Sequence, residues 1–172
     1  MRNVLIAAVA ILVVPVAPGQ PLKPLPGLVT PFRTGPAADT TVTPNVWLYV
    51  PSSQPPTPFL SAGSFTATWD GALVAELRGD FTFRAVLRGS LKLEINGVSV
   101  LDVAGADDQP SASSASVRLN KGPNILKATY TAPAAGDASV RLQWSENKGI
   151  LWEPINLGQL THTASPEADQ GA

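Results

Sequence analysis

Hydrophobic residues recur at every second position over much of the chain after Val46. A period of two places alternate side chains on opposite faces of a β-strand, so it predicts strands with one buried face. The clearest run covers residues 80–87, followed closely by residues 91–95. The side chains expected on buried faces are Phe65, Ala67, Trp69, Leu73, Ala75, Leu77, Phe81, Phe83, Ala85, Leu87, Leu91, Leu93, Ile95, Val117, Leu119, Leu126, Ala128, Tyr130, Val140, Leu142 and Trp144.

Short turn signals separate these runs. Asn96-Gly97 is the strongest, because a two-residue hairpin turn needs positive φ at both central positions. Asp70-Gly71 predicts another turn, residues 120–124 and 134–137 predict two more, and residues 105–114 predict a longer loop. Eight or nine short strands with this rhythm predict an all-β fold. We expect an antiparallel β-sandwich of the jelly-roll-like, lectin-like kind.

The chain divides into four segments. Residues 1–19 read as a signal peptide, and residues 20–44 as a proline-rich extended segment with one edge strand near residues 28–33. Residues 45–152 form the predicted sandwich. Residues 153–172 become polar and predict a flexible C-terminal tail or linker that begins by folding back over the sandwich.

The N-terminal segment has a short positive start and an apolar run from Val4 to Ala17. This pattern is typical of a cleavable signal peptide, and the run is shorter than the roughly 20 residues of a membrane-spanning helix. We expect cleavage between about Ala17 and Gly19, with no membrane span in the mature chain. An uncleaved N-terminal anchor is the alternative. Either interpretation predicts an exported protein, which after cleavage is periplasmic, extracellular or on the cell surface.

Composition narrows the function classes. The chain has 12 basic and 13 acidic residues, and its formal net charge is -1. It lacks the clusters of Lys and Arg that nucleic-acid binding requires, so no nucleic-acid partner is expected. It has no cysteine, which removes disulfides, thiolate metal ligands and cysteine nucleophiles.

The aromatic residues give two candidates for a binding surface. Trp69 and Trp144 share the phase of the predicted core, so we expect them to pack inside. Trp47 and Trp152 fall outside that pattern and are the candidate ligand-binding aromatics. Their indoles could stack on the apolar face of a sugar. The alternative is that they cover sheet edges or attach the terminal segments.

Acidic residues give a second candidate site. Asp107 and Asp108 are adjacent in a Ser/Ala-rich loop and could bind calcium with loop oxygens, although a solvated loop is the simpler interpretation. His162, the only histidine, falls in the predicted tail, where it could not act in catalysis. Other carboxylates fall at predicted turns or on outward strand positions, so we expect no enzyme. They are Asp70, Glu76, Asp80, Glu94 and Asp102.

Several of these motifs together resemble the protective-antigen fourteen-kilodalton domain family. They are the tryptophan and glycine at Trp69 and Gly71, the Gly-x-Phe-x-Phe strand from Gly79 to Phe83, the Ile-Asn-Gly hairpin at residues 95–97 and the Arg-Leu-Gln-Trp strand at residues 141–144. The resemblance covers roughly residues 26–152. It implies a β-sandwich module that binds carbohydrate or interacts with other proteins.

The resemblance also bears on cofactors and partners. In calcium-dependent members two consecutive aspartates follow the Phe-x-Phe strand, but here Leu87 and Arg88 occupy those positions. No cofactor is therefore expected. The leading hypothesis is a non-catalytic glycan-binding module of an exported envelope or periplasmic protein. The alternative is a structural or protein-interaction domain, a docking or spacing unit in an envelope or electron-transfer assembly. Residues 153–172 resemble the spacer before a c-type cytochrome module, which is a possible neighbour.

Overall fold

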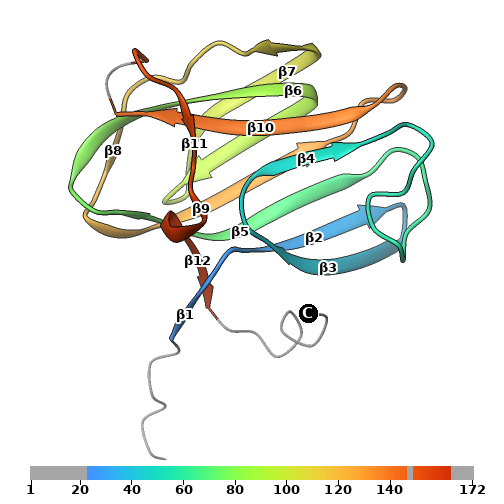
Figure 1. Cartoon of the computed structure of the whole chain (residues 1–172), viewed down its shortest axis with the longest axis horizontal. Helices are drawn as coiled ribbons and strands as arrows, with labels where there is room; N and C mark the ends of the chain where they lie inside the picture. Colours follow the sequence, from blue (N-terminus) through green and yellow to red (C-terminus); the bar gives the residue numbers. More distant parts are fainter. Residues whose placement is uncertain (1–22, 147–148, 164–172) are drawn as a thin grey trace, which may run out of the picture.

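The computed structural model describes residues 23–146 and 149–163 (Figure 1). Within these residues the chain forms twelve β-strands and one short 3-10 helix. The elements are β1 (Pro24–Pro26), β2 (Leu28–Thr34), β3 (Ala37–Thr43), β4 (Trp47–Val50), β5 (Thr66–Ala75), β6 (Gly79–Ile95), β7 (Val98–Pro110), β8 (Val117–Leu119), β9 (Gly122–Thr131), β10 (Ala138–Ser145), β11 (Glu153–Pro154), η1 (Leu157–Gln159) and β12 (Leu160–Thr163).

The strands form one antiparallel hydrogen-bonded sheet that curls into two facing layers, which confirms the predicted sandwich. In the first layer β3, β2, β5 and β9 lie side by side, and β9 pairs with the second half of β6. In the second layer β4 and β11 pair with β10, which pairs with the first half of β6. The long strand β6 therefore belongs to both layers.

Gly89 is the point at which β6 passes between the layers. Residues 82–88 pair with β10 and residues 90–95 pair with β9. Gly89 has φ +121°, and a Cβ atom there would lie 2.4 Å from the carbonyl oxygen of Thr131 and 2.8 Å from the Tyr130 hydroxyl. Only glycine allows both this dihedral angle and this close approach. The Tyr130 hydroxyl donates a hydrogen bond to the Arg88 carbonyl beside the bend.

The core lies between the layers and uses the alternate residues that the sequence indicated. Phe83, Leu93 and Trp69 are fully buried, and Trp144 stacks on Phe81 with ring centroids 4.8 Å apart. One contiguous cluster includes nearly all the predicted inward side chains. The Asn96-Gly97 hairpin is also confirmed, with φ values of 52° and 78°.

The predicted turn at Asp70-Gly71 is wrong, because β5 continues through both residues. Gly71 has a different role. A Cβ atom there would lie 2.4 Å from the Thr161 carbonyl oxygen and 2.6 Å from the Leu28 side chain, so the glycine lets β12 and β2 approach β5. Leu77, expected in the core, lies after the end of β5 and is exposed.

The proline-rich segment contains more sheet than expected. Strand β2 is not an edge strand, because it pairs with both β3 and β5. Strand β2 pairs with β5 at Val29, opposite Asp70, and again at Phe32, opposite Ala67. Pro31 lies between these two pairs and has no partner on β5, so its lack of a backbone N–H is tolerated there. The outer strand of this layer is β3.

The expected tail is also part of the fold as far as Thr163. Strand β12 pairs with β5 and with β1, and β11 pairs with β10. His162 is therefore not in a solvated tail: its side chain is 5% exposed and its Nδ1 lies 3.1 Å from the Gly27 carbonyl oxygen. The expected loop at residues 105–114 is shorter than predicted, since β7 runs to Pro110.

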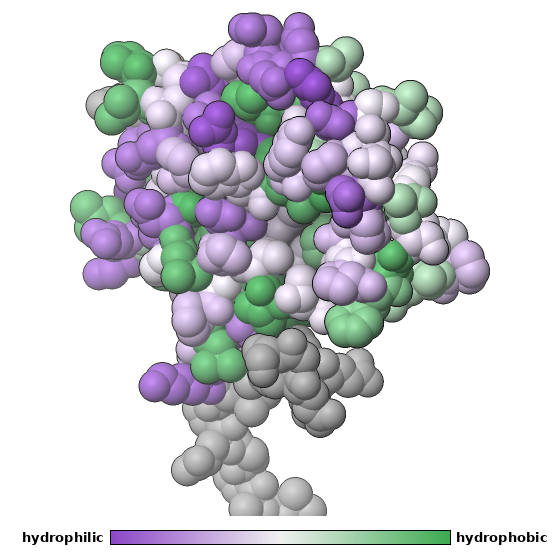
Figure 2. Space-filling model, turned by 45° about the vertical axis from the view of Figure 1, so that its right-hand side comes forward, coloured by the Kyte–Doolittle hydropathy of each residue, from purple (hydrophilic) through white to green (hydrophobic). Residues whose placement is uncertain are grey.

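Some predictions fall outside the described residues, namely the signal peptide at residues 1–19 and the end of the tail after Thr163. In the described part of the chain, the structure contains no helix of the length and hydrophobicity needed to cross a membrane. Hydrophobic residues on the surface in Figure 2 are scattered in small groups among polar ones.

Candidate functional site

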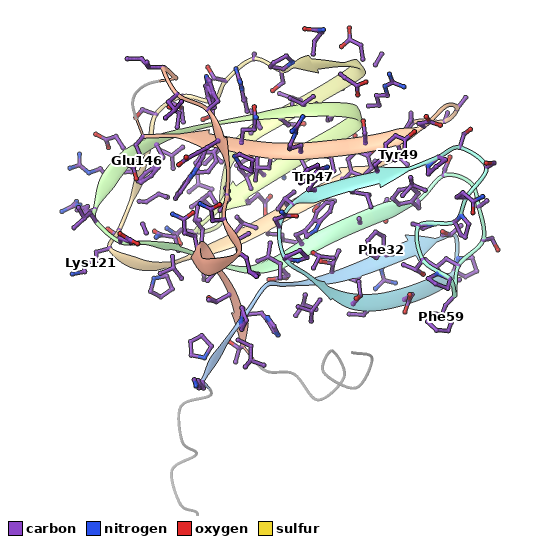
Figure 3. The ribbon with its side chains drawn as sticks, in the orientation of Figure 1. Phe32, Trp47, Tyr49, Phe59, Lys121 and Glu146 are labelled. Atoms are coloured by element: carbon purple, nitrogen blue, oxygen red, sulfur yellow. The ribbon has the colours of Figure 1, made fainter. Side chains whose placement is uncertain are left out.

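The outer surface of the second layer brings aromatic and charged side chains together. We call it the Trp47 face. Trp47 and Tyr49 project from β4 beside β10 (Figure 3). On β10 and β6 the outward positions are those between the buried ones, so each strand adds residues to the same surface. The face consists of Trp47, Tyr49, Arg84, Val86, Arg88, Ser139, Arg141 and Gln143.

A groove with a volume of about 290 Å³ lies on this face. It combines exposed aromatic rings with hydrogen-bonding groups, namely a carboxylate, a hydroxyl and a guanidinium. Trp47 and Tyr49 are 55% and 60% exposed, so both rings are accessible. The lining residues are Trp47, Leu48, Tyr49, Val86, Asp108, Ser139, Val140 and Arg141.

Both candidate tryptophans contact an arginine of this face. The Arg141 guanidinium carbon lies 5.3 Å from the centre of the Trp47 ring, and that of Arg84 lies 4.4 Å from the centre of the half-buried Trp152 ring. Arg84 Nε also donates to Gln143 Oε1 at 2.9 Å. Burial lowers the pKa of Arg84 from its usual value. Both distances are within the range of cation–π contacts, so each guanidinium is attracted to the face of an indole.

The structure separates the two adjacent aspartates. Strand β7 contains a bulge beside β6. Leu87 of β6 pairs with Asp107, but the next residue, Val86, pairs with Pro110, so Asp108 and Gln109 have no partner on β6. Asp108 lies in this bulge, and its carboxylate accepts a hydrogen bond from Arg88 at 2.9 Å. Asp107 pairs with the buried Leu87, so it projects from the opposite face, and it accepts a hydrogen bond from the Gln109 backbone.

A further acidic residue borders the groove. The Asp137 carboxylate accepts hydrogen bonds from the Ser52 backbone N–H at 3.0 Å and from the Tyr49 hydroxyl at 2.8 Å. These bonds lower the pKa of Asp137, with that from Ser52 the larger cause. The hydrogen bond to Asp137 and the charge of that carboxylate raise the pKa of Tyr49 from its usual value. This contact links the loop after β4 to the turn before β10.

The carboxylates of Asp107 and Asp108, the candidate calcium ligands, do not lie together on one face. Calcium takes six to eight oxygen ligands, usually including several carboxylates. Here the Arg88 guanidinium already lies against Asp108, and Asp107 faces away. Among the described residues, no group of three or more His, Asp or Glu side chains converges on a possible metal position.

Sequence reasoning found part of this face. Trp47, Trp152 and Asp108 lie on it or against it, whereas Asp107 does not. It missed Arg84, Arg141 and the pairing of Arg88 with Asp108. The outward phase of residues 84–88 and 139–143 was visible in the alternation, but the strand order that places those residues side by side was not.

A larger hollow of about 580 Å³ lies on the first layer, around β2, β5 and β12. Its lining is mostly apolar, and the lining residues that the structure describes include no Trp, Tyr or Phe. It includes polar side chains, among them Asp70, Thr161 and Thr163, but its described residues offer no exposed aromatic ring. The Trp47 face remains the stronger candidate.

A family model, that of the PA14 domain, matches residues 20–170. No curated protein matches the sequence.

Solved structures share the fold at low sequence identity. An anti-sigma factor domain-containing protein from Clostridium clariflavum has a TM-score of 0.68 and 18% identity over 83% of this chain, which spans 48% of that protein's chain. The PA14 sugar-binding domain of an RTX adhesin has a TM-score of 0.64 and 17% identity over 80% of this chain and 99% of its own. The A domain of epithelial adhesin 9 from Candida glabrata, solved with Galβ1-4GlcNAc, has a TM-score of 0.64 and 10% identity over 90% of this chain and 94% of its own.

Proposed function

Because the chain belongs to the PA14 domain family, we propose that it is a non-catalytic carbohydrate-binding module whose ligand lies on the Trp47 face. The observation that carries this proposal is the groove itself. Trp47 and Tyr49 present exposed rings beside Ser139, Asp108 and Arg141. Sugars have an apolar C–H face and polar hydroxyls, so they need both an aromatic surface and nearby donors and acceptors.

Two structural neighbours support the carbohydrate assignment. One carries the description of a sugar-binding domain and the other was solved with a disaccharide. Their identity to this chain is below 20%, so the ligand must be sought experimentally. The Arg141 guanidinium covers part of the Trp47 ring, and the remaining exposed part of the indole is available to a sugar.

We further propose that binding does not require calcium. Arg88 and Leu87 occupy the positions of the aspartate pair of calcium-dependent members, and the Arg88 guanidinium lies 2.9 Å from Asp108, where its charge neutralises that carboxylate. Glycan binding should therefore persist in EDTA. A large loss of affinity in EDTA that is restored by added calcium would contradict this.

The absence of catalysis is part of the proposal. The chain has no cysteine, and His162 lies in β12 with its Nδ1 near the Gly27 carbonyl oxygen, away from the groove. A polysaccharide that binds should show no new reducing ends after prolonged incubation with the protein. Release of reducing ends that scales with protein concentration would contradict this.

A glycan array followed by calorimetry with the full chain tests the main proposal. Trp47→Ala should lower affinity about five- to tenfold, as expected for loss of an aromatic contact. Phe59→Ala is the matched control, because Phe59 is an exposed aromatic residue that does not line the groove. Silence across the array would favour the docking or spacing role instead. Equal affinity for the Trp47 variant would mean that the glycan binds away from the Trp47 face.

We also propose that the domain works outside the cytoplasm, at the envelope or beyond it. The support is the apolar N-terminal run at residues 4–17. N-terminal sequencing of protein from the native host should find a mature start close to Gln20. Recovery of cytoplasmic protein that retains Met1 would contradict export. The neighbouring c-type cytochrome module stays a prediction that the continuation of the gene would test.

A further inference from the structure

Three arginines lie together on the Trp47 face because of the register between β6 and β10. Arg141 pairs with Val86, and Arg84 and Arg88 are two residues to either side of Val86. Cross-strand diagonal neighbours of this kind have Cα atoms about 7–8 Å apart. Their side chains point to the same outer surface, since the intervening residues Ala85 and Leu87 are buried.

Only one of the three has an acidic partner within the described part of the chain. Arg88 pairs with Asp108 at 2.9 Å. Arg84 contacts Gln143 and Trp152, and Arg141 contacts the Trp47 ring. No carboxylate of the described residues lies within ion-pair distance of Arg84 or Arg141.

The acidic residues nearby leave a positive excess. Asp108 and Asp137 border the groove, and Asp137 is already occupied by Tyr49 and Ser52. Asp107 and Glu153 pair with the buried Leu87 and Trp144, so their positions project from the other face. Three guanidinium groups thus face two carboxylates. Like charges on neighbouring positions repel one another weakly in water, so an anionic ligand on this surface would be favoured.

We infer that the natural ligand of this face is an acidic glycan whose sugar units carry carboxylate groups. This inference rests on the proposed function and specifies its ligand class. Arginine binds carboxylates through two parallel N–H donors, and a guanidinium that contacts an indole can still donate hydrogen bonds to a carboxylate. The sugar ring stacks on Trp47 while its carboxylate pairs with Arg141. A neighbouring acidic unit along the polymer pairs with Arg84 beside Trp152.

Polygalacturonate and its fully methyl-esterified form provide a matched test. Both polymers have the same sugar stereochemistry, but esterification removes the charge. The full chain should bind the acid form at least about tenfold more tightly, since a charge-assisted hydrogen bond has this effect or a larger one. Affinity for the acid form should also fall as salt rises, because exposed charges are screened.

Substitutions locate the contact. Arg141→Gln and Arg84→Gln should each lower affinity for polygalacturonate about tenfold and leave affinity for the ester unchanged. Arg118→Gln is the control, since Arg118 is an exposed arginine that pairs with Asp80 on β6 away from the groove. Circular dichroism and the urea midpoint confirm that each variant is folded.

The outcomes separate the two proposals. If acid and ester bind equally, or if Arg141→Gln binds the acid as well as the original chain does, the acidic-ligand inference is overturned while glycan binding stands. If a single-stranded oligonucleotide binds as tightly as polygalacturonate, the face recognises polyanions in general and the inference is also overturned. If neither these polymers nor a glycan array gives any binding, both proposals fail.

Discussion

The two halves of β6 have the same inner surface and different outer surfaces. Both halves bury alternate hydrophobic residues in one core. In the second half the outward Lys92 and Glu94 form an ion pair at 2.7 Å, and Lys127 and Asp70 continue the alternation of charge across β9 and β5. In the first half, Arg84 and Arg88 lie beside Arg141 and two tryptophans. Outward charges in the first layer thus neutralise one another, whereas in the second layer Arg84 and Arg141 have no acidic partner among the described residues.

The difference between the two outer surfaces is not explained by the core, because both halves of β6 bury alternate hydrophobic residues in the same way. Glu94 raises the pKa of Lys92 above its usual value, and Lys92 lowers the pKa of Glu94 below its usual value. Both shifts are expected for an ion pair, in which each charge stabilises the other. Arg141 has no such partner among the described residues. A surface that is less well compensated than its neighbour on the same strand is the one to examine for function.

The largest expected effect separates the buried from the exposed tryptophans. Trp144→Ala should reduce the free energy of unfolding by about 3–5 kcal/mol, because it removes a fully buried ring that stacks on Phe81. Trp47→Ala should leave the urea midpoint nearly unchanged and weaken glycan binding. Urea unfolding followed by fluorescence measures the first, and calorimetry the second. Similar losses of stability for both variants would mean that Trp47 is structural.

The second prediction concerns the bend that divides β6. Gly89→Ala should cost about 2–4 kcal/mol, because it adds backbone strain to a clash with Thr131 and Tyr130. Gly97→Ala is the control, since its φ is also positive but no atom lies within 4 Å of the added Cβ. It should cost about 1 kcal/mol. Equal costs for the two variants would show that close packing at the bend contributes nothing.

The third prediction tests the packing of Tyr130 beside that bend. Burial raises the pKa of Tyr130 to about 12. The unfolded chain loses this proton near pH 10, so between about pH 10 and 12 ionisation favours the unfolded state. The stabilisation from the neutral buried hydroxyl is complete below pH 10 and is lost as the pH rises through 12.

Urea unfolding at a series of alkaline pH values measures this loss. Tyr130→Phe should abolish this contribution to the pH dependence while costing about 1 kcal/mol at neutral pH for the lost hydrogen bond to Arg88. Tyr49→Phe should keep most of the alkaline loss, because the buried Tyr130 that causes it is unchanged. An alkaline slope that is unchanged in the Tyr130 variant would contradict the assignment.

The smallest expected effect on stability sharpens the contrast between the two outer surfaces. Asp108→Asn and Glu94→Gln each remove the acidic member of an exposed pair, so both should shift the urea midpoint only slightly. Only Asp108→Asn should raise affinity for an acidic glycan, because it frees Arg88. A gain of affinity in the Glu94 variant, or a loss in the Asp108 variant, would contradict the acidic-ligand inference. A loss in the Asp108 variant would still agree with glycan binding on the Trp47 face, because Asp108 lines the groove.

The sequence alone predicted most of the core and the fold class. Alternation at Phe81, Phe83, Leu91 and Leu93 is a local property, since a strand that buries one face must place every second residue inward. The Asn96-Gly97 hairpin was predictable for the same reason, because its backbone angles depend on those two residues. Local patterns therefore identified the strands and several turns.

Other features depended on distant parts of the chain. Asp70-Gly71 resembles a turn locally, yet it lies within β5. Strands β12 and β2 pack so closely against β5 at Gly71 that a side chain there would clash with them. His162 lies in a locally polar segment, yet it is buried because β12 pairs with β1 and β5.

The candidate site shows the same division. The sequence identified Trp47, Trp152 and Asp108 by residue type, but the arginines became part of the site only when β4, β10 and β6 were aligned. Alternation determines which side of a strand a residue occupies, because that follows from backbone geometry. Which strands lie next to each other, and in what register, is determined by packing between residues far apart in the sequence, so only the tertiary structure could place Arg84, Arg88 and Arg141 on one surface.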